Sequence, residues 1–462
     1  MRSIRRLLPA ALAAAALFVA SATGAAAGAA GRQREPFFPR AGNVGYEVRQ
    51  YDAHLDYQPG NGFLRASATL RARALQRLRR FSLDLDGLRV TSVLVNGKPA
   101  RFNRGRGKLK VTPATPVGAR QVFGVLVRYR GVPRKVTDPD GGQEGWYRTD
   151  DGALAVGEPV GTAAWLPCNN IPNDKAAFAV SISVPAGLEG VSNGRLEEVS
   201  HRGDRTIFSW AAEEPMSPYL ALVDIGRGRL VKTMADGLPT WTLVDPRQAR
   251  ASRRVLAKLP QIIRFESNVY GPYPFQAAGS VVDVAPRLGY ALETQTRPIY
   301  AFVPDLTTVV HETAHQWFGD SVGLRRWPNI WLNEGFATWT EWFYAERHGG
   351  RPARQIFRRL YRTPAANTEF WDPPSGHPGT PKNLFATSTY VRGGMTLEAL
   401  RVEIGTRTLL TLLRRWVAGH AFANADIQQF EELAEQVSGR QLDRFFQRWL
   451  YQRGKPRGYG SI

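Results

Sequence analysis

The stretch VVHETAHQWFGD, residues 309–320, contains two of the seven histidines of this 462-residue chain. His311 and His315 are four positions apart, and Glu312 directly follows the first of them. If residues 305 to 318 form a helix, both imidazoles lie on one face and can reach one ion, whereas Glu312 points beside it. Two histidines supply two of the three protein ligands of a catalytic zinc, whose fourth position holds water. The spacing therefore predicts a metal centre on a helix.

The third ligand is expected to be an oxygen from a second helix, in the stretch WLNEGFATWTEW, residues 331–342. Glu334 follows His315 after the intervening residues 316–333, and we predict it as the third ligand. Glu341 lies seven positions further on and is predicted to hydrogen-bond a ligand imidazole, with a plain surface charge as the alternative. Chance histidines on a solvated helix are the alternative for the whole pattern. A glutamate segment at this distance argues against that alternative.

Composition limits the class of protein. With 43% hydrophobic residues, the chain can bury the cores of two or three domains. Cys168 is the single cysteine, so an intramolecular disulfide is impossible. The net charge of +21 favours anionic surroundings such as cell-wall polymers or lipid headgroups, and electrostatic association with an anionic envelope is one expectation. Lysines and arginines are spread along the chain rather than clustered, so no nucleic-acid partner is predicted.

The N-terminus has the pattern of a secretory signal peptide. Three arginines at positions 2, 5 and 6 precede an apolar run over residues 7–20, and the small-residue tract ASATGAAAGAAG follows. The apolar run is too short for a stop-transfer segment, so no transmembrane segment is expected in the mature chain. We predict cleavage of residues 1–30 and a secreted or extracytoplasmic location. The Sec and twin-arginine export routes both stay open.

The rest of the chain divides into two regions. From about residue 46 to 225, apolar residues alternate with polar ones, as in AFAVSISV, residues 177–184, which is typical of strands with one buried face. Beyond about residue 237 the spacing becomes helical, as in ASRRVLAKLPQIIRFESNVYG, residues 251–271. The prediction is an α+β protein with a sandwich-like β domain over residues 36–235 and a mainly helical domain over residues 236–456.

The stretch HETAHQWFGD followed by WLNEGFATW resembles the aminopeptidase N family of zinc metallopeptidases, whose leukotriene hydrolase branch shares the scaffold. The segments TAAWLPCNNIPNDKAAFAVSISVP, GYALETQT and STYVRGGMTLEALR extend the resemblance over most of the mature chain. It implies a β-saddle N-terminal domain followed by a thermolysin-like zinc metallopeptidase domain.

The resemblance also implies residue roles. One zinc ion per chain would be held by His311, His315 and Glu334, and Glu312 would be the general base. The remaining implied roles are oxyanion stabilisation by Tyr390, capture of the substrate amine by Glu293, and substrate binding by Gly289 and Ala291. The chemistry is consistent, because zinc lowers the pKa of bound water to about 7, so that a carboxylate can accept its proton. A phenol can also donate to the oxygen that becomes negative.

Several positions depart from the family pattern. In GYALET, Leu292 and Thr294 replace the usual methionine and asparagine. The second polar amine anchor of relatives corresponds here to Val160; Glu158 substituting for it and Glu293 acting alone are both open. Arg392 replaces the usual lysine beside Tyr390 with retention of charge. The sequence stops where larger relatives continue into a helical domain, so a less enclosed cleft is expected.

The predicted function is an exported zinc aminopeptidase that acts on peptides with a free N-terminus. A zinc endopeptidase with a relaxed requirement for the free amine is the alternative among enzymes, supported by Val160. A basic envelope-binding protein with an inactive metal site is the alternative from another class. The presence of base, three ligands and tyrosine together argues against an inactive site.

Overall fold

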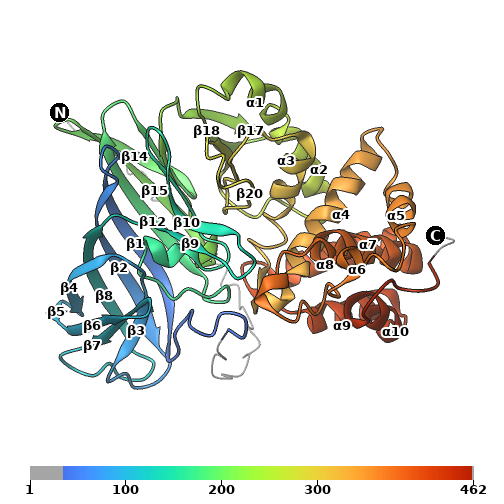
Figure 1. Cartoon of the computed structure of the whole chain (residues 1–462), viewed down its shortest axis with the longest axis horizontal. Helices are drawn as coiled ribbons and strands as arrows, with labels where there is room; N and C mark the ends of the chain where they lie inside the picture. Colours follow the sequence, from blue (N-terminus) through green and yellow to red (C-terminus); the bar gives the residue numbers. More distant parts are fainter. Residues whose placement is uncertain (1–34, 460–462) are drawn as a thin grey trace, which may run out of the picture.

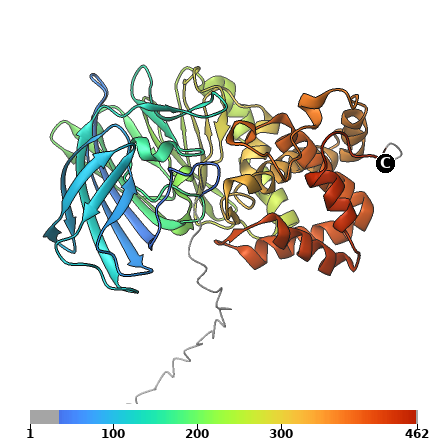
Figure 2. The same cartoon turned by 60° about the horizontal axis from the view of Figure 1, so that its bottom comes forward.

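The computed structural model describes residues 35–459, and the predicted signal peptide lies outside this range. The described chain forms two lobes, one built of strands and one mainly of helices (Figure 1). The same division is visible from a second direction in Figure 2. Among residues 35–459, every helix is too short or too polar to span a bilayer. The predicted α+β fold class is confirmed.

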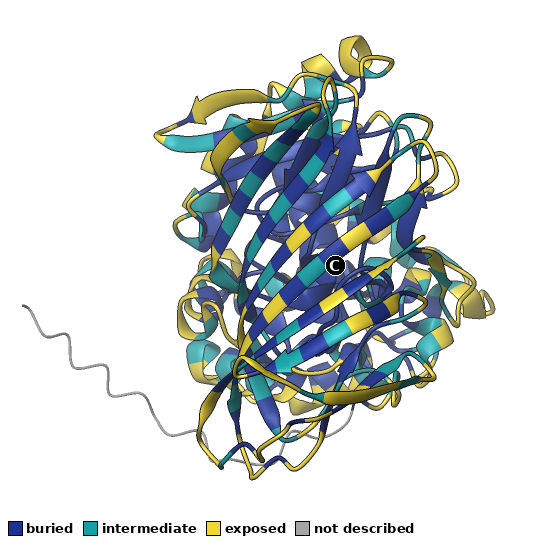
Figure 3. Cartoon of the chain, turned by 90° about the vertical axis from the view of Figure 1, so that its left-hand side faces the viewer, coloured by how far each residue is buried: buried dark blue, intermediate teal, exposed yellow. Residues whose placement is uncertain are grey.

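The first lobe is dominated by an eight-stranded sheet with the strand order β14-β15-β12-β1-β2-β8-β4-β5. Its strands are β1 (Tyr46–Gln58), β2 (Phe63–Ala74), β4 (Arg89–Val95), β5 (Lys98–Pro99), β8 (Val122–Gly131), β12 (Ala176–Pro185), β14 (Arg195–Arg202) and β15 (Arg205–Met216). Buried and partly exposed residues alternate along β12, as the sequence pattern predicts. Figure 3 shows this alternation as bands along the long strands. One face of the sheet is therefore core and the other faces solvent.

A second, five-stranded sheet with the order β13-β16-β11-β10-β9 completes the lobe together with a three-stranded sheet, β3-β7-β6. The strands of the two smaller sheets are β9 (Lys135–Thr137), β10 (Gln143–Arg148), β11 (Ala153–Val156), β13 (Glu189–Ser192), β16 (Val223–Gly226), β3 (Phe81–Asp84), β6 (Arg101–Gly105) and β7 (Lys108–Thr112). All residues of β11 and β16 are buried. These two strands therefore lie inside the molecule, next to the second lobe.

The second lobe begins with a five-stranded sheet that the helical spacing of apolar residues beyond residue 237 does not predict. Its order is β17-β18-β19-β21-β20, and β18, β19 and β21 run parallel. The strands are β17 (Val231–Ala235), β18 (Leu238–Val244), β19 (Ala278–Val282), β20 (Ala291–Leu292) and β21 (Ile299–Tyr300). The domain boundary predicted between residues 235 and 236 falls in the turn of the β17–β18 hairpin. By strand pairing, β17 belongs to the second lobe.

Helices make up most of the second lobe. They are α1 (Ala249–Leu256), α2 (Leu259–Tyr270), α3 (Leu306–Ala314), α4 (Trp331–Arg347), α5 (Ala353–Tyr361), α6 (Thr368–Trp371), α7 (Thr387–Ile404), α8 (Thr406–His420), α9 (Ile427–Ser438) and α10 (Asp443–Phe446). A short parallel pair, β22 (Gly323–Leu324) and β23 (Asn424–Ala425), connects the segment after α3 to the segment before α9. Helix α4 packs against both α3 and α7.

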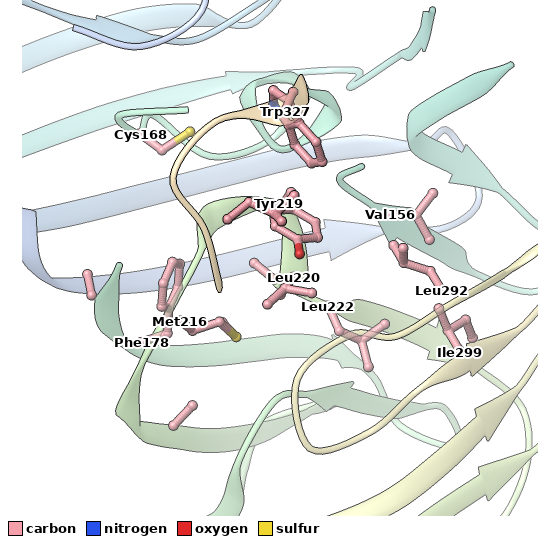
Figure 4. Packing of buried hydrophobic residues seen from close by; sticks show 14 of the residues in the cluster. Val156, Cys168, Phe178, Met216, Tyr219, Leu220, Leu222, Leu292, Ile299 and Trp327 are labelled. Carbon is pink, nitrogen blue, oxygen red and sulfur yellow. The ribbon is translucent and has the colours of Figure 1, made fainter. Parts of the chain in front are cut away.

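The two lobes share one hydrophobic core. Figure 4 shows Tyr219, Leu220 and Leu222 of the first lobe next to Leu292, Ile299 and Trp327 of the second. The rings of Tyr219 and Trp327 are 5.0 Å apart between centroids. Because apolar burial is continuous across the junction, moving the lobes apart would expose core surface to water.

Helices α4 and α7 cross at a pair of glycines. A Cβ atom on Gly393 would lie 2.8 Å from the Cα of Gly335, and one on Gly335 would lie 2.9 Å from backbone atoms of Gly393. Neither distance leaves room for a methyl group between two backbones. The two glycines thus allow the close contact that brings Glu334 of α4 and Tyr390 of α7 to the same region.

We expect Gly393→Ala to destabilise the protein by about 1–3 kcal/mol, because the added methyl group must push two packed helices apart. Urea unfolding of the variant measures the change. The matched control is Gly419→Ala on α8, where a Cβ would meet nothing within 4 Å. There the better helix propensity of alanine should stabilise by up to about 1 kcal/mol. Equal stabilities for the two variants would contradict the packing argument.

Candidate metal centre

Helix α3 presents the two histidines. Its N-terminus is capped by Asp305, whose carboxylate accepts a hydrogen bond from the backbone N–H of Thr308 at 2.8 Å. The helix ends at Ala314, but His315 keeps helical angles as the residue that follows (φ −59°, ψ −23°). The imidazoles of His311 and His315 therefore lie one turn apart, with ring centroids separated by 4.8 Å.

Hydrogen bonds fix the orientation of both rings. His315 Nδ1 lies 3.0 Å from the carbonyl oxygen of Phe318, and a carbonyl can only accept, so Nδ1 carries a hydrogen and Nε2 is the nitrogen that can bind a metal ion. His311 Nδ1 lies 2.6 Å from Glu341 Oε1. The structure thus places Glu341 against a ligand imidazole, where a carboxylate orients the ring and raises its basicity.

The two Nε2 atoms meet the carboxylate of Glu334, which lies in the first turn of α4. Glu334 Oε2 is 3.3 Å from His311 Nε2 and 3.5 Å from His315 Nε2. One ligand atom from each of the three residues lies within 4.8 Å of the others. Two nitrogen donors and one oxygen donor on two helices are the donor set that zinc accepts in sites with an open fourth position.

Electrostatics make this site attractive to a cation. Burial lowers the pKa of His315, but the carboxylates of Glu334 and Glu293 outweigh burial and raise it to about 9. Burial raises the pKa of Glu334, whereas the two neighbouring imidazoles lower it to about 2. The buried Glu334 carboxylate therefore keeps its negative charge, and the raised pKa values of His311 and His315 mean that both imidazoles hold protons, which a metal ion would displace. A divalent ion satisfies all three groups at once.

Glu312 lies beside the ligands without belonging to them. Its side chain is 6% exposed, and one of its carboxylate oxygens lies within 4.8 Å of ligand atoms of Glu293 and His315. Burial is the main reason why the pKa of Glu312 is raised to about 7. A carboxyl group with a pKa near neutrality can both accept and donate a proton, which suits a general base.

A cavity of about 330 Å³ opens over the metal ligands. It is lined by Asp138, Asp140, Gly142, Gln143, Glu158, Tyr290, Ala291, Glu293, Thr308, His311, Glu312, His315, Glu334, Phe385 and Tyr390. Six of these residues carry carboxylates, and within residues 35–459 the lining contains no lysine or arginine. The cavity therefore favours a positively charged occupant.

Two carboxylates at the wall of the cavity have free oxygens. Glu158 Oε1 and Glu293 Oε1 are both buried and have no hydrogen-bond donor within the described residues. Ligand atoms of Glu158, Glu293 and Glu334 lie within 4.8 Å of one another. Val160 does not line the cavity, and its backbone N–H donates to Glu144 Oε2 at 2.9 Å. Glu158, rather than the residue at position 160, thus faces the metal centre.

Tyr390 reaches the cavity from α7. Its ring stacks against that of His311, with centroids 6.2 Å apart and an interplanar angle of 28°. Burial, with the nearby Glu334 carboxylate, raises the pKa of Tyr390 well above its usual value, so the phenol keeps its proton and can donate it in a hydrogen bond. Two residues further on, Arg392 is fully buried, and its guanidinium donates to carbonyls that include those of Trp371 and Trp449. The Arg392 guanidinium therefore binds backbone carbonyls of the C-terminal segment, and Arg392 does not line the cavity.

Of the predicted substrate-binding residues Gly289 and Ala291, only one lines the cavity. Ala291 lines the cavity, but Gly289 is exposed and does not; Tyr290 lines it instead. The Tyr290 hydroxyl donates to the carbonyl of Gln143 at 3.0 Å. Sequence reasoning also missed Asp138 and the rest of the loop between β9 and β10, because that loop reaches the cavity through sheet pairing rather than through a motif.

The fold and the site define a class of two-lobed proteins that hold one metal ion between a His-Glu-x-x-His helix and a glutamate on a following helix. The chain belongs to peptidase family M1. Residues 48–220 match the peptidase M1 N-terminal domain, and residues 304–449 match the peptidase family M1 domain.

Curated relatives and solved structures agree with this assignment. Probable aminopeptidase 2 of Sulfurisphaera tokodaii is 23% identical over 82% of this chain and 51% of its own length. Leucyl aminopeptidase of Saccharolobus solfataricus is 22% identical over 89% of this chain and 54% of its own length. The chain thus spans about half the length of these relatives. The crystal structure of an M1 zinc metallopeptidase from Deinococcus radiodurans superposes with a TM-score of 0.83 at 26% identity, covering 93% of this chain and 100% of that one.

Proposed function

We propose that this protein is a zinc aminopeptidase that removes N-terminal residues from peptides. The observation that carries the proposal is the pair of free carboxylate oxygens, on Glu158 and Glu293, beside the metal ligands. A peptide α-ammonium group offers N–H donors and a positive charge, and two carboxylates can accept from it with charge-assisted hydrogen bonds. The site therefore suits a substrate whose first peptide bond lies next to the metal.

The relatives support the same reaction. Sulfurisphaera tokodaii and Saccharolobus solfataricus proteins carry the name aminopeptidase, and a mutant of the Deinococcus radiodurans M1 zinc metallopeptidase has been crystallised with a Tyr-Ser-Ala substrate. That structure shares 26% identity with this chain over its whole length. A protein of this fold and size can therefore accommodate a short peptide.

Zinc held by His311, His315 and Glu334 would supply Lewis acidity at the scissile carbonyl and acidify the attacking water. Glu312 accepts the proton of that water at its carboxylate and delivers it to the nitrogen of the leaving amine. The Tyr390 hydroxyl donates a hydrogen bond to the carbonyl oxygen as negative charge develops on it. Glu158 and Glu293 hold the α-ammonium group and so position the first peptide bond.

The endopeptidase alternative needs no counter-charge for an amine. A peptide chain that runs through the site places a neutral N–H near Glu158 and Glu293. Burial raises the pKa of both carboxyl groups, and a neutral N–H supplies no positive charge to stabilise their ionised forms. The geometry of Glu158 therefore favours the aminopeptidase over the endopeptidase. The alternative of an envelope-binding protein with an inactive centre gives no reason for the placement of Glu312 and Tyr390 around the ligands.

We expect Glu312→Gln to keep its zinc and to lose about 10²- to 10⁴-fold in kcat, because the amide cannot accept the proton of water. Zinc content by atomic emission and turnover of aminoacyl fluorogenic substrates measure the two effects separately. Glu197→Gln, a change at a half-exposed glutamate of the first lobe, is the control. Near-normal turnover in zinc-loaded Glu312→Gln would rule out the role of general base.

We expect wild type to cleave a free-amine substrate and to leave its N-acetylated form intact. Glu158→Gln should lower kcat/KM for the free-amine substrate by about 10- to 100-fold, since a charge-assisted hydrogen bond contributes about 1.5–3 kcal/mol. Any residual cleavage of the acetylated substrate should not fall with it, because that substrate has no α-ammonium group for Glu158 to hold. Equal cleavage of both substrates by wild type would identify an endopeptidase.

We also propose that the protein is exported and that its positive charge favours an anionic envelope. The support is the signal-peptide pattern of residues 1–30 and the net charge of +21. N-terminal sequencing of protein recovered outside the cytoplasm should begin within or just after residues 20–31. Envelope-bound protein should be released by salt, because surface charges are screened at high ionic strength. An intact N-terminus would contradict the proposed cleavage of a signal peptide. Release that does not depend on salt would contradict the proposed electrostatic association with the envelope.

A further inference from the structure

A second group of carboxylates lies at the junction of the two lobes, and none of its members lines the peptide cavity. Asp151 belongs to the turn between β10 and β11, and Asp224 lies on β16, both in the first lobe. Asp245 and Asp283 directly follow β18 and β19, which are parallel neighbours in the second lobe. The carboxyl ends of adjacent parallel strands thus face two acidic residues of the other lobe.

The group is compact and buried. One carboxylate oxygen from each of Asp151, Asp245 and Asp283 lies within 4.8 Å of the others. Asp224 is 2% exposed and Asp283 is 4% exposed, and their two carboxylates lie within hydrogen-bonding reach of each other. Asp224 Oδ1 and Asp283 Oδ2 are buried and have no donor among the residues that the structure describes. Two buried carboxylate oxygens of the group therefore lack a hydrogen-bond donor that would offset their charge.

The surrounding donors do not balance the charge. The Arg247 guanidinium contacts Asp245 at 2.7 Å and Asp150 at 2.8 Å, and about half of its side chain is exposed. The other recorded donors to the group are neutral. Backbone N–H groups of Arg227, Arg247 and Val284 donate to Asp151, Asp245 and Asp283 respectively, and the Thr149 hydroxyl also donates to Asp151. Four carboxylates thus share one guanidinium that is already divided between two partners.

Repulsion within the group is reflected in its protonation. Burial, followed by the charges of Asp283 and Asp151, raises the pKa of Asp224 well above its usual value. Burial also raises the pKa of Asp283 to about 6. The group must therefore take up protons or a cation to remain buried at neutral pH.

We propose that Asp151, Asp224, Asp245 and Asp283 bind a calcium ion that joins the two lobes. Every ligand atom is an oxygen, which selects a hard cation, and the absence of histidine or thiolate from these four residues disfavours zinc. Calcium accepts six to eight oxygens in irregular geometry, whereas magnesium requires near-octahedral coordination and keeps much of its water. Four carboxylates from two lobes, with water completing the shell, suit calcium better.

The proposed ion lies at the start of the segment that leads to the peptide cavity. Asp283 begins the connection from β19 to β20, and its backbone N–H donates to the carbonyl of Tyr300 on β21 at 3.1 Å. Strand β20 pairs with β21 and is followed at once by Glu293. Calcium at Asp283 would therefore hold both the lobe junction and the strand that delivers the predicted amine anchor.

Calcium titration of the zinc-loaded full chain tests the proposal without reference to peptidase activity. Calorimetry should show one site with a Kd of about 10⁻⁴–10⁻³ M or tighter, the range of extracellular calcium modules. The Tm should rise with calcium concentration up to about 10 mM, since the ion binds only the folded state. Magnesium should give a clearly smaller rise at the same concentration.

Two variants sharpen the test. Asp224→Asn removes one charge, and its amide can donate to Asp283, so we expect a Tm without calcium at least equal to that of wild type and loss of most of the calcium-dependent rise. Asp150→Asn is the matched control, because Asp150 is 83% exposed and stands next to Asp151 without belonging to the group. It should respond to calcium like wild type.

Three outcomes would overturn the proposal. These are the absence of both heat and a Tm shift in wild type up to about 10 mM calcium, an unchanged calcium response in Asp224→Asn, and an equal loss of response in Asp150→Asn. If wild type ignores calcium but becomes more stable as the pH falls through about 6, the group is instead neutralised by a proton shared between Asp224 and Asp283. Each of these results is independent of whether the zinc site cleaves peptides.

Discussion

The meeting of two imidazole Nε2 atoms with the Glu334 carboxylate is the contact on which the rest of the site depends. It requires α3 and α4 to lie side by side, and α4 in turn touches α7 through Gly335 and Gly393. The same helix packing therefore sets the distance between the ligands and Tyr390. His315 and Glu334 are buried among closely packed side chains, so the packing of the core limits how far these two ligands can move.

The metal ligands could be predicted from the sequence because their geometry is local. A spacing of four residues on a helix places His311 and His315 on one face whatever the rest of the chain does. The cavity wall could not be predicted in the same way. Asp138 reaches it through the pairing of β9 with β10, and the sequence alone left open whether Glu158 substitutes for Val160 or Glu293 acts alone. The strand pairing that places these residues at the cavity is decided by contacts between segments far apart in the sequence.

Arg392 shows a second limit of sequence reasoning. The sequence predicts a positive charge beside Tyr390, and the structure turns that charge away from the cavity toward carbonyls such as those of Arg448 and Gln452. A buried guanidinium needs several acceptors, and the ends of the C-terminal helices supply them as free carbonyls. The fold decides which backbone carbonyls come near the Arg392 guanidinium. The amino-acid sequence around Arg392 does not show which carbonyls these are.

Positive and negative charges are distributed unevenly between the surface and the interior of the molecule. The chain carries a net charge of +21, yet six carboxylates line one cavity, and three aspartates gather at the lobe junction with Asp224 in hydrogen-bonding reach of one of them. At physiological ionic strength exposed charges are screened over about 8–10 Å, so groups buried inside a cavity respond mainly to their nearest neighbours. The basic exterior and the acidic interior can thus act independently. The proposed association with an anionic envelope would depend on the exterior, whereas the two buried groups of carboxylates would each attract cations: a metal ion and the proposed substrate ammonium group in the cavity, and the proposed calcium ion at the lobe junction.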